Sequence, residues 1–308
     1  MYYKFLNMDI SIIVPHKNST ALLERLLLSI PDTKKTEIII VDDQSEKEEK
    51  EKLKSFISKY KIKFYENEGR YAGGARNTGL KYATGKWIMF ADADDYFTID
   101  VRCLIEQYLN SDYDIVFFNV ISKYSATGED AYRAAHVQSL IQKASSKNDL
   151  DVLRCCYTAP WGKMIKRQLV QENDIRFDEV IAGNDMMFSV LCGIKAKSIG
   201  YEKNPIYCVT VTWGSITTTL TRDRFDSRFK VTLNVNNLLR KEGYGKYQIS
   251  VLYFIAKSYQ FGIKYMLSVI IECIKNRSNI FVGFAKLLNV KSVLKDRQNI
   301  KKSEKEQK

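Results

Sequence analysis

The chain has 308 residues, of which 45% are hydrophobic, and it carries a formal net charge of +12 with an isoelectric point near 9.2. This length allows one large domain or two modest ones, and the hydrophobic content excludes a wholly disordered chain. The excess of basic residues suits an anionic partner such as nucleic acid, an anionic membrane surface or a phosphorylated substrate, and it also suits plain solubility.

Three classes of feature are absent from the sequence pattern. Six cysteines and two histidines are scattered without CxxC or zinc-ligand spacing, so no zinc site is expected. The opening MYYKFLNMDI lacks the long apolar segment of a signal peptide. The most apolar late stretch, VLYFIAKSYQFGIKYMLSVIIECI, is interrupted by Lys257 and Lys264, so we predict no transmembrane helix.

The first hundred residues alternate between strand and helix patterns. Apolar strands are predicted at 9–15, 37–43, 62–67 and 87–91, and helices at 21–30, 46–60 and 73–84. Strands that are apolar along their length indicate an α/β fold with a mostly parallel sheet covered by helices. Ligands of such sheets bind at the carboxyl ends of strands, where Asp42, Asp43, Asp92 and Asp94 fall.

The later elements are shorter and then become helical. We expect a strand at 113–122, a loop entering a helix at 158–170, and a helix at 184–197 with Asp185 in its first turn. From about Ser215 onward, aromatic and aliphatic residues alternate with Lys and Arg in a helical pattern. The expected division is therefore a domain at 9–215 and a basic helical region at 216–308.

The stretch WIMFADADDYF places three carboxylates, Asp92, Asp94 and Asp95, directly after a buried strand. Clustered carboxylates repel one another, and a divalent cation or a cationic ligand compensates for that repulsion. An Asp-x-Asp pair is a compact ligand set for Mg²⁺ or Mn²⁺. One alternative is a capping cluster on a loop. Another is the aspartyl nucleophile of phosphatases, which usually lies on the first strand, whereas this motif follows about the fourth.

Two further motifs can each be interpreted as functional or as purely structural. The acids of VDDQS (41–45) are placed to accept hydrogen bonds from a base or ribose, or to cap the following helix. In GRYAGGARNTGL (69–80), Gly73 and Gly74 allow a tight turn just before a helix, and Arg76 is a partner for phosphate or a base edge. The alternative for this second motif is a glycine turn beside a surface arginine.

Taken together, the motifs SIIVPHKN, IIIVDDQS, GGARNTGL, GKWIMFADADD, PWGKMIKR and GNDMMF occur in an order that resembles the family 2 glycosyltransferases, which have the GT-A fold. The likeness is greatest to bacterial members that build surface polysaccharides, and it covers about residues 9–215. It implies transfer of a sugar from a nucleotide-diphosphate sugar, most simply a UDP-sugar, with Mn²⁺ or Mg²⁺ as cofactor.

The resemblance also implies roles for individual residues. Asp185 matches the general base, and the alternative is that it caps its helix. Asp94, with Asp92, matches the metal ligands. The residues matched to donor binding are Pro15, Asp42, Asp43, Arg76, Asn77 and Asp92. A single base and a single displacement imply inversion at the anomeric carbon.

Two departures from the family pattern affect the donor and acceptor sites. Lys17 stands where the family often has a Tyr near the base, and Asn184 replaces the Glu of the common ED pair. We expect Asn184 to contact the acceptor. Trp161 and Trp213 are candidates for stacking on its sugars, and each has a core tryptophan as its alternative.

The C-terminal region has three interpretations, namely a helical cap on the acceptor side, an aromatic and basic face on an anionic membrane, or a site for a partner chain. We expect a cytoplasmic enzyme, peripheral on the inner face of a bacterial membrane, whose acceptor is a surface glycan or a lipid-linked oligosaccharide. No nucleic-acid module is visible. The rivals are a sugar-phosphate nucleotidyltransferase, whose glycine-rich loop is missing here, and a non-catalytic nucleotide-sugar or glycan-binding module, which would lack the base.

Overall fold

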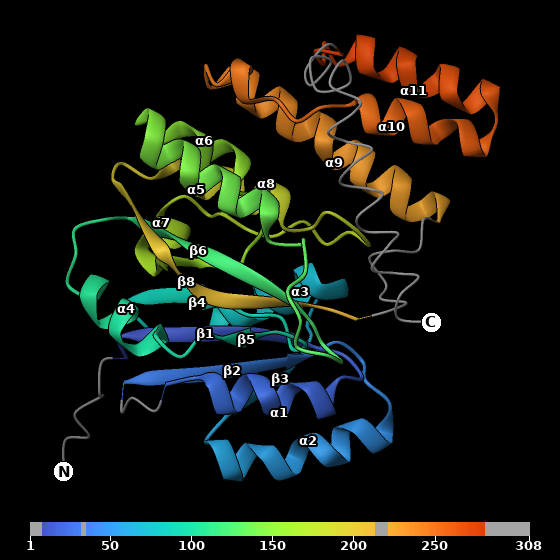
Figure 1. Cartoon of the computed structure of the whole chain (residues 1–308). Helices are drawn as coiled ribbons and strands as arrows, with labels where there is room; N and C mark the ends of the chain where they lie inside the picture. Colours follow the sequence, from blue (N-terminus) through green and yellow to red (C-terminus); the bar gives the residue numbers. More distant parts are fainter. Residues whose placement is uncertain (1–7, 32–34, 213–220, 281–308) are drawn as a thin grey trace. The chain divides into compact units, whose positions relative to one another are not determined.

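The computed structural model describes residues 8–31, 35–212 and 221–280 (Figure 1). The chain divides into two compact units, Met1–Val231 and Thr232–Lys308. The first unit is built of strands and helices, and the second is helical in its described part. Among the described residues, no helix is long and apolar enough to cross a lipid bilayer.

The described strands of the first unit form one sheet in the order β3-β2-β1-β4-β7-β6-β8-β5. These strands are β1 Ile10–His16, β2 Thr36–Asp42, β3 Lys63–Glu66, β4 Trp87–Phe90, β5 Tyr96–Phe97, β6 Ile115–Tyr124, β7 Lys163–Lys166 and β8 Ile199–Val211. Four neighbouring pairs are parallel, and the pairs β4–β7, β6–β7 and β5–β8 are antiparallel. The strands predicted in the first ninety residues are all present.

The carboxyl ends of β1, β2 and β4 lie at one edge of the sheet because these strands are parallel neighbours. Backbone bonds continue just beyond the strands: the amide of Asp43 donates to the carbonyl of His16 at 2.8 Å, and the amide of Ala91 donates to the carbonyl of Ile13 at 3.1 Å. The acidic residues that follow β2 and β4 therefore emerge at the same edge of the sheet, on either side of the end of β1, as the alternating strand–helix pattern predicts.

Helices cover both faces of the sheet. They are α1 Thr20–Ser29, α2 Lys47–Tyr60, α3 Tyr71–Tyr82, α4 Val101–Tyr108, α5 Ala135–Lys147, α6 Asp151–Cys156, α7 Arg167–Glu172 and α8 Met186–Lys195. Figure 1 shows α1 and α2 on one side of the sheet and α5, α6 and α8 on the other. Stacked Phe177 and Phe188, with ring centroids 3.8 Å apart, pack against Phe90 of β4 and join the α8 layer to the sheet.

Helix α3 begins at Tyr71, so the prediction that Gly73 and Gly74 form a turn before the helix is wrong. Both glycines lie in its first turn, where close packing requires them. A Cβ atom on Gly73 would collide with the carbonyl oxygen of Asp178, and one on Gly74 would lie 2.7 Å from the backbone of Gly69. Gly73 therefore allows a close approach to a segment distant in sequence, and Gly74 allows a close approach to the chain just before the helix.

The segment predicted as a loop entering a helix at 158–170 also differs. It contains β7, which pairs antiparallel with both β4 and β6, before α7 begins at Arg167. The four residues KMIK are too few to show an alternating pattern. Two of them are lysines, which are uncommon in buried strands, although the first three residues are buried here. The insertion of β7 between β4 and β6 holds the two halves of the sheet together.

The described part of the second unit consists of the C-terminal half of α9 (Arg222–Lys241), the single turns η1 (Gly245–Tyr247) and η2 (Tyr259–Phe261), and the helices α10 (Leu252–Ser258) and α11 (Ile263–Lys275). Helices α10 and α11 pack on each other. Buried side chains from α9, α10 and α11, including Leu239, Phe254 and Val269, form the small core of this unit.

Candidate active site

The two acids that follow β2 have different surroundings. Asp42 has no exposed side-chain surface: one carboxylate oxygen lies 3.0 Å from Nδ1 of His16, and the other accepts the amide of Ser45 at 3.0 Å. Lys50 Nζ lies 3.5 Å from that second oxygen. Burial opposes ionisation of Asp42, but hydrogen bonds from Ser45 and His16 outweigh it and hold its pKa below the usual range. Both carboxylate oxygens of Asp42 therefore already have protein partners, and we do not assign Asp42 a role in donor binding.

Asp43, the next residue, keeps a partly exposed carboxylate. Asn67 donates from Nδ2 to Oδ1 of Asp43 at 2.7 Å, and Lys17 Nζ lies 4.0 Å from Oδ2. Lys17, which replaces the Tyr common in the resembled family, therefore lies beside the acid that the family pattern assigns to the base. Pro15 is half-buried in β1, opposite Val41 of β2, and lies one residue before the end of that strand.

The three acids after β4 are held in a tight turn by β8. The amide of Asp92 donates to the hydroxyl oxygen of Tyr207 at 2.8 Å, and the amide of Asp95 donates to the carbonyl of Asp92 at 3.0 Å. Thr210 donates its amide to the Asp95 carboxylate at 2.7 Å and its hydroxyl to the carbonyl of Asp94 at 2.6 Å. Asp95 is thus committed to holding the turn, whereas Asp92 and Asp94 stay partly accessible.

The electrostatics of this turn favour a cationic partner. Burial raises the pKa of Asp94, the neighbouring charge of Asp92 raises it further, and the guanidinium groups of Arg133 and Arg25 offset only part of this rise. Burial and the charges of Asp94 and Asp92 raise the pKa of Asp95 well above its usual range. The turn therefore concentrates negative charge whose repulsion the described protein groups only partly relieve.

Arg76 of α3 joins the acidic turn to the segment before α8. Its side chain is 6% exposed, with Nη2 2.7 Å from Oδ1 of Asp92 and Nη1 donating to Oδ1 of Asn184 at 2.9 Å. The guanidinium also lies 5.4 Å from the ring centroid of Phe177. One arginine thus connects the end of β4 with a segment about ninety residues later. Asn184, expected at the acceptor, has its side-chain oxygen engaged in this contact.

Asp185 occupies the residue before α8, yet its side chain makes no capping hydrogen bond. The capping alternative therefore does not hold. Burial raises the pKa of Asp185 and the charge of Asp92 adds to the rise, while the positive charges of Arg76 and Lys163 lower it. Arg76 thus acts electrostatically on both Asp92 and Asp185, which groups the proposed donor acid and the proposed base around one guanidinium.

Lys163 is a feature that the sequence analysis missed. This residue of β7 is 2% exposed, and its Nζ donates to the carbonyl of Tyr157 at 2.6 Å and lies 4.7 Å from the centroid of the same ring. Burial lowers the pKa of Lys163 to about 7, against the opposing effects of Cys192 and Asp185. The signal available in the sequence was a lysine within PWGKMI, an otherwise apolar run.

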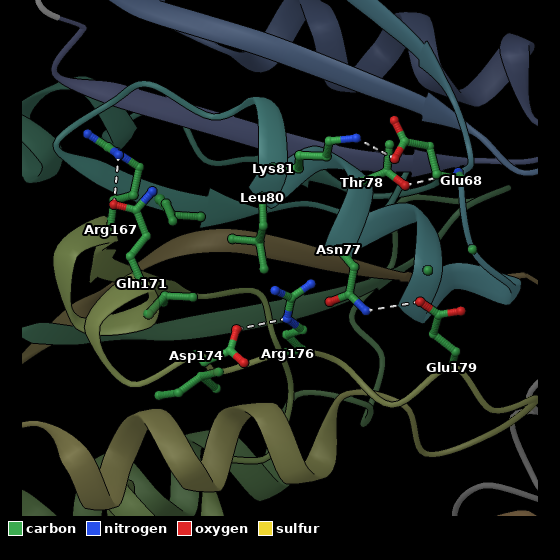
Figure 2. Close-up of a pocket in the computed structure, with 15 residues that line it drawn as sticks. Glu68, Asn77, Thr78, Leu80, Lys81, Arg167, Gln171, Asp174, Arg176 and Glu179 are labelled. Carbon is green, nitrogen blue, oxygen red and sulfur yellow. Dashed lines mark hydrogen bonds and ion pairs between the residues drawn. The ribbon is translucent and has the colours of Figure 1, made fainter.

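Asn77 does not join the group around Arg76. Its side-chain oxygen accepts the amide of Phe177 at 2.8 Å, and its Nδ2 donates to the carbonyl of Phe177 at 3.0 Å and to Glu179 at 3.3 Å. Figure 2 shows Asn77 and Glu179 at the wall of a cavity of about 740 Å³ between α3, α7 and the 174–179 segment. We therefore treat Asn77 as a support for that segment and not as a donor ligand.

The cavity in Figure 2 is lined by none of the acids after β2 or β4, and Asp185 is not part of it either. Four of its charged groups are ion-paired, Lys81 with Glu68 at 2.7 Å and Arg176 with Asp174 at 2.9 Å. The other two, Arg167 and Glu179, are hydrogen-bonded to Gln171 and Asn77. We place the chemistry at the strand ends instead, where charge is incompletely compensated.

The two tryptophans expected at the acceptor have different outcomes. Trp161 is 8% exposed and stacks on Tyr207, with centroids 5.9 Å apart and planes 17° apart, so it is a core residue that supports the turn. The prediction that it stacks on sugars is not favoured by this burial. Trp213 lies outside the described residues.

A family model described as glycosyl transferase family 2 matches residues 11–173, which is more than half of the chain. The chain belongs to glycosyl transferase family 2. The matched segment of this family 2 chain runs from β1 to the end of α7. It includes Asp43 after β2, Arg76 on α3 and the acidic turn after β4, but it stops before Asp185.

Several named bacterial transferases are similar to this family 2 chain. It is 26% identical over 207 residues to the poly(ribitol-phosphate) β-N-acetylglucosaminyltransferase TarS of Staphylococcus aureus, an alignment that covers 65% of the chain and 35% of TarS. It is 24% identical over 276 residues to the cholesterol galactosyltransferase of Borreliella burgdorferi, covering 80% and 74% of the two chains. The family 2 chain thus aligns with only about a third of the length of TarS.

Solved structures show the same fold. The crystal structure of TarS 1–349 in complex with UDP-GlcNAc matches with a TM-score of 0.61 and 20% identity, covering 82% of the family 2 chain and 73% of that structure. The mannosyltransferase PcManGT of Pyrobaculum calidifontis, in complex with GDP-Man and Mn²⁺, matches with a TM-score of 0.51 and 13% identity, covering 92% and 79%. The predicted GT-A type of α/β fold, with helices at its C-terminal end, is confirmed.

The two accessible acids of the turn after β4, Asp92 and Asp94, are of the type that binds a hard divalent ion. Among the described residues, no group of three or more His, Cys, Asp or Glu side chains is arranged to hold a metal by itself. Mg²⁺ sites commonly use one or two carboxylates and complete their coordination with water and substrate phosphates. Asp92 and Asp94 supply two such carboxylates, and their mutual repulsion is what a cation would relieve.

Proposed function

We propose that the chain is an inverting, metal-dependent glycosyltransferase that moves a sugar from a nucleotide-diphosphate sugar to a glycan or lipid-linked oligosaccharide acceptor. The observation that carries the proposal is the position of Arg76, which binds Asp92 and Asn184 and acts electrostatically on Asp185. One cationic side chain thereby gathers a donor-side carboxylate and a partly buried carboxylate that caps no helix.

The proposed reaction is a single displacement at the anomeric carbon. The acceptor oxygen forms a bond to that carbon as the bond between the carbon and the β-phosphate oxygen breaks, and the nucleoside diphosphate leaves with the bonding electron pair. Asp185 receives the acceptor proton at its carboxylate, and the raised pKa makes it a stronger base than an exposed Asp. Because attack and departure occur on opposite faces of the sugar, the configuration inverts.

Charge that develops on the leaving diphosphate needs stabilisation. Mn²⁺ or Mg²⁺, when bound, supplies Lewis acidity at the diphosphate oxygens, and Asp94 with Asp92 would hold the ion. Arg76 adds a fixed positive charge on the protein side, held in place by Asp92, Asn184 and Phe177. The bonds from Tyr207 and Thr210 keep the acidic turn from moving as that charge forms.

The donor assignment to a UDP-sugar draws on the first strand ends and on the comparisons. Asp43 is the acid of its pair that remains accessible. Asn67 is hydrogen-bonded to it, and the Lys17 ammonium lies nearby. TarS, which shares the fold, has been crystallised with UDP-GlcNAc and with UDP. Lys17 provides a cation where a stacking Tyr is common, so it is the residue through which base preference would change.

The acceptor and the site of action are proposed from the relatives. Their names include a poly(ribitol-phosphate) β-N-acetylglucosaminyltransferase and a GalNAc(5)-diNAcBac-PP-undecaprenol β-1,3-glucosyltransferase, which is 28% identical over 181 residues, 57% of each chain. From these names we propose that the acceptor is an intermediate of bacterial surface polysaccharide synthesis and that the chain meets it at the cytoplasmic face of the membrane. The C-terminal region as an acceptor-side cap remains a prediction.

A donor panel tests the proposal against its rivals. The chain is incubated with UDP-, GDP- and dTDP-sugars, with Mn²⁺ or with EDTA, and the released nucleotide is measured. A glycosyltransferase releases nucleoside diphosphate in the presence of metal. In a parallel reaction with a nucleoside triphosphate and a sugar phosphate, a nucleotidyltransferase would instead release pyrophosphate. A binding module would release neither nucleoside diphosphate nor pyrophosphate. Once an acceptor is found, NMR of the product shows whether the anomeric configuration has inverted.

A further inference from the structure

Helix α11 of the second unit carries an apolar stripe that its own unit leaves open. At 3.6 residues per turn, its four aliphatic residues fall within about 80° of one another on the helix surface. Each is at least half exposed: Ile263 61%, Leu267 52%, Ile271 50% and Ile274 62%. The buried residues of the same helix, Val269 and Cys273, lie on its far side. The helix therefore has one apolar face packed in its core and another facing outward.

The stripe is held in a fixed orientation within the second unit. Asn237 of α9 donates to the side chain of Asn276, which follows α11, at 3.1 Å. Arg240 of α9 donates to the carbonyl of Arg277 at 2.8 Å. These bonds and the buried residues fix the packed face of α11, so the outward face is a feature of the folded unit.

Positive charge is concentrated in the same unit. Residues 232–308 contain 15 Lys and Arg against 5 Asp and Glu, a net charge of +10 out of +12 for the whole chain. On α11 itself, Lys264 and Lys275 are exposed along one border of the stripe, and Glu272 is the single acid of the helix. An outward aliphatic face with a basic border is the pattern of a helix that lies in a membrane interface.

The positive charge of the second unit favours an anionic membrane over a second copy of the chain as the partner of the stripe. A second copy of the chain would bring two units of +10 together, and their repulsion would oppose pairing through this face. An anionic lipid surface matches both features, because its acyl region takes the aliphatic side chains and its headgroups attract the lysines. We propose that the α11 stripe (Ile263, Leu267, Ile271 and Ile274) is a docking surface for an anionic membrane, with Lys264 and Lys275 at the level of the headgroups.

The full chain and vesicles of phosphatidylcholine, with or without 30% phosphatidylglycerol, test the proposal by co-sedimentation in low and high salt. The stripe variant is Leu267→Ser with Ile271→Ser. Its matched control is Leu28→Ser with Ile99→Ser, which removes two exposed aliphatic residues from the first unit. The charge variant is Lys264→Glu with Lys275→Glu, and its control is Lys143→Glu with Lys147→Glu on α5, which changes net charge equally.

The wild-type chain should bind the anionic vesicles, and high salt should weaken this binding because salt screens surface charge. The stripe and charge variants should each lose about tenfold or more in partition, whereas both controls should bind as wild type does. No sugar donor or acceptor is present, so the result does not depend on the proposed transfer activity.

Three outcomes would overturn the proposal. The first is equal binding of variants and controls. The second is binding that does not change with phosphatidylglycerol or salt. The third is a lipid-free dimer, seen by light scattering, that only the stripe variant abolishes, which would assign the stripe to self-association. A melting temperature measured for each variant verifies that lost binding is not lost folding.

Discussion

Asp185→Asn is the substitution that most directly tests the proposed base. It keeps the size of the side chain and removes only the negative charge and the basic oxygen. No capping bond is lost, because Asp185 makes none, and Arg76 keeps its contacts to Asp92 at 2.7 Å and to Asn184 at 2.9 Å. Relief of a buried charge offsets weaker attraction to Arg76 and Lys163, so we expect stability to change by about 1 kcal/mol or less.

The effect on turnover should be far larger than the effect on stability. A positioned general base contributes roughly a hundredfold or more to the rate, which corresponds to about 2.7 kcal/mol in the activation barrier. Donor affinity should remain within a few-fold, because the base meets the acceptor and is not required to hold the nucleotide. The expected signature is therefore a large fall in kcat with an almost unchanged dissociation constant for the donor.

The assay follows release of nucleoside diphosphate with acceptor present, or hydrolysis of the donor by water until an acceptor is known. Asp178→Asn is the matched control, because Asp178 is a half-buried carboxyl on the segment before α8 whose pKa is also raised by burial. The wild-type rate should fall as the pH is lowered through the raised pKa of Asp185, since the protonated carboxyl cannot accept a proton.

Near-normal turnover by Asp185→Asn, at a melting temperature close to that of wild type, would refute the assignment of the base. An equal loss in Asp178→Asn would show instead that any charge change in this segment disrupts the site. Either result would reopen the choice between a different base and a different class of enzyme.

The other predictions concern donor, metal and buried charge. Asp94→Ala should fold and should lose Mn²⁺-dependent UDP binding in calorimetry, and an unchanged affinity with Mn²⁺ would remove Asp94 from the metal site. Asp43→Ala and Arg76→Ala should each weaken UDP binding by about 1.5–3 kcal/mol, roughly ten- to a hundredfold, whereas identical titrations would contradict the donor assignment. Lys163→Met should show a melting temperature that rises relative to wild type as the pH is lowered from about 9.5 to about 7. The unfolded lysine binds its proton up to about 10.5 and the folded one only to about 7, so wild type loses stability over this range, and a constant gap would show that burial does not shift this pKa.

Local patterns predicted the strands and helices of the first ninety residues. β1, β2 and β4 are largely aliphatic or aromatic runs, and β3 is a short mixed strand. All four alternate with helices of clear period, so the acids that follow β2 and β4 could be placed at one edge of the sheet. What local patterns could not show was which acid of a pair is free. Asp42 and Asp43 are equivalent in sequence, and Asp42 is committed to the interior by His16, which comes from β1, together with the local turn that brings the amide of Ser45 to its carboxylate.

Other features escaped prediction because their causes are distant in sequence. Gly73 is small because Asp178 approaches it, about a hundred residues later, and not because of its own turn. Trp161 resembles a sugar platform in isolation, but Tyr207 covers it. Lys163 follows a glycine and looks like a loop residue, although the folded sheet encloses it completely. Pairings of this kind become visible only once the sheet order is known.

The hold of β8 on the acidic turn has a consequence for where the protein can be shortened. The family match ends at residue 173, and a gene trimmed there would still encode Asp43, Arg76 and all three acids after β4. Yet the polypeptide would lack Tyr207 and Thr210, whose hydroxyl and amide groups fix those acids, and it would leave one fork of Arg76 without Asn184. A shortened version for crystallisation should therefore extend past β8, because residues of that strand hold the acidic turn in place.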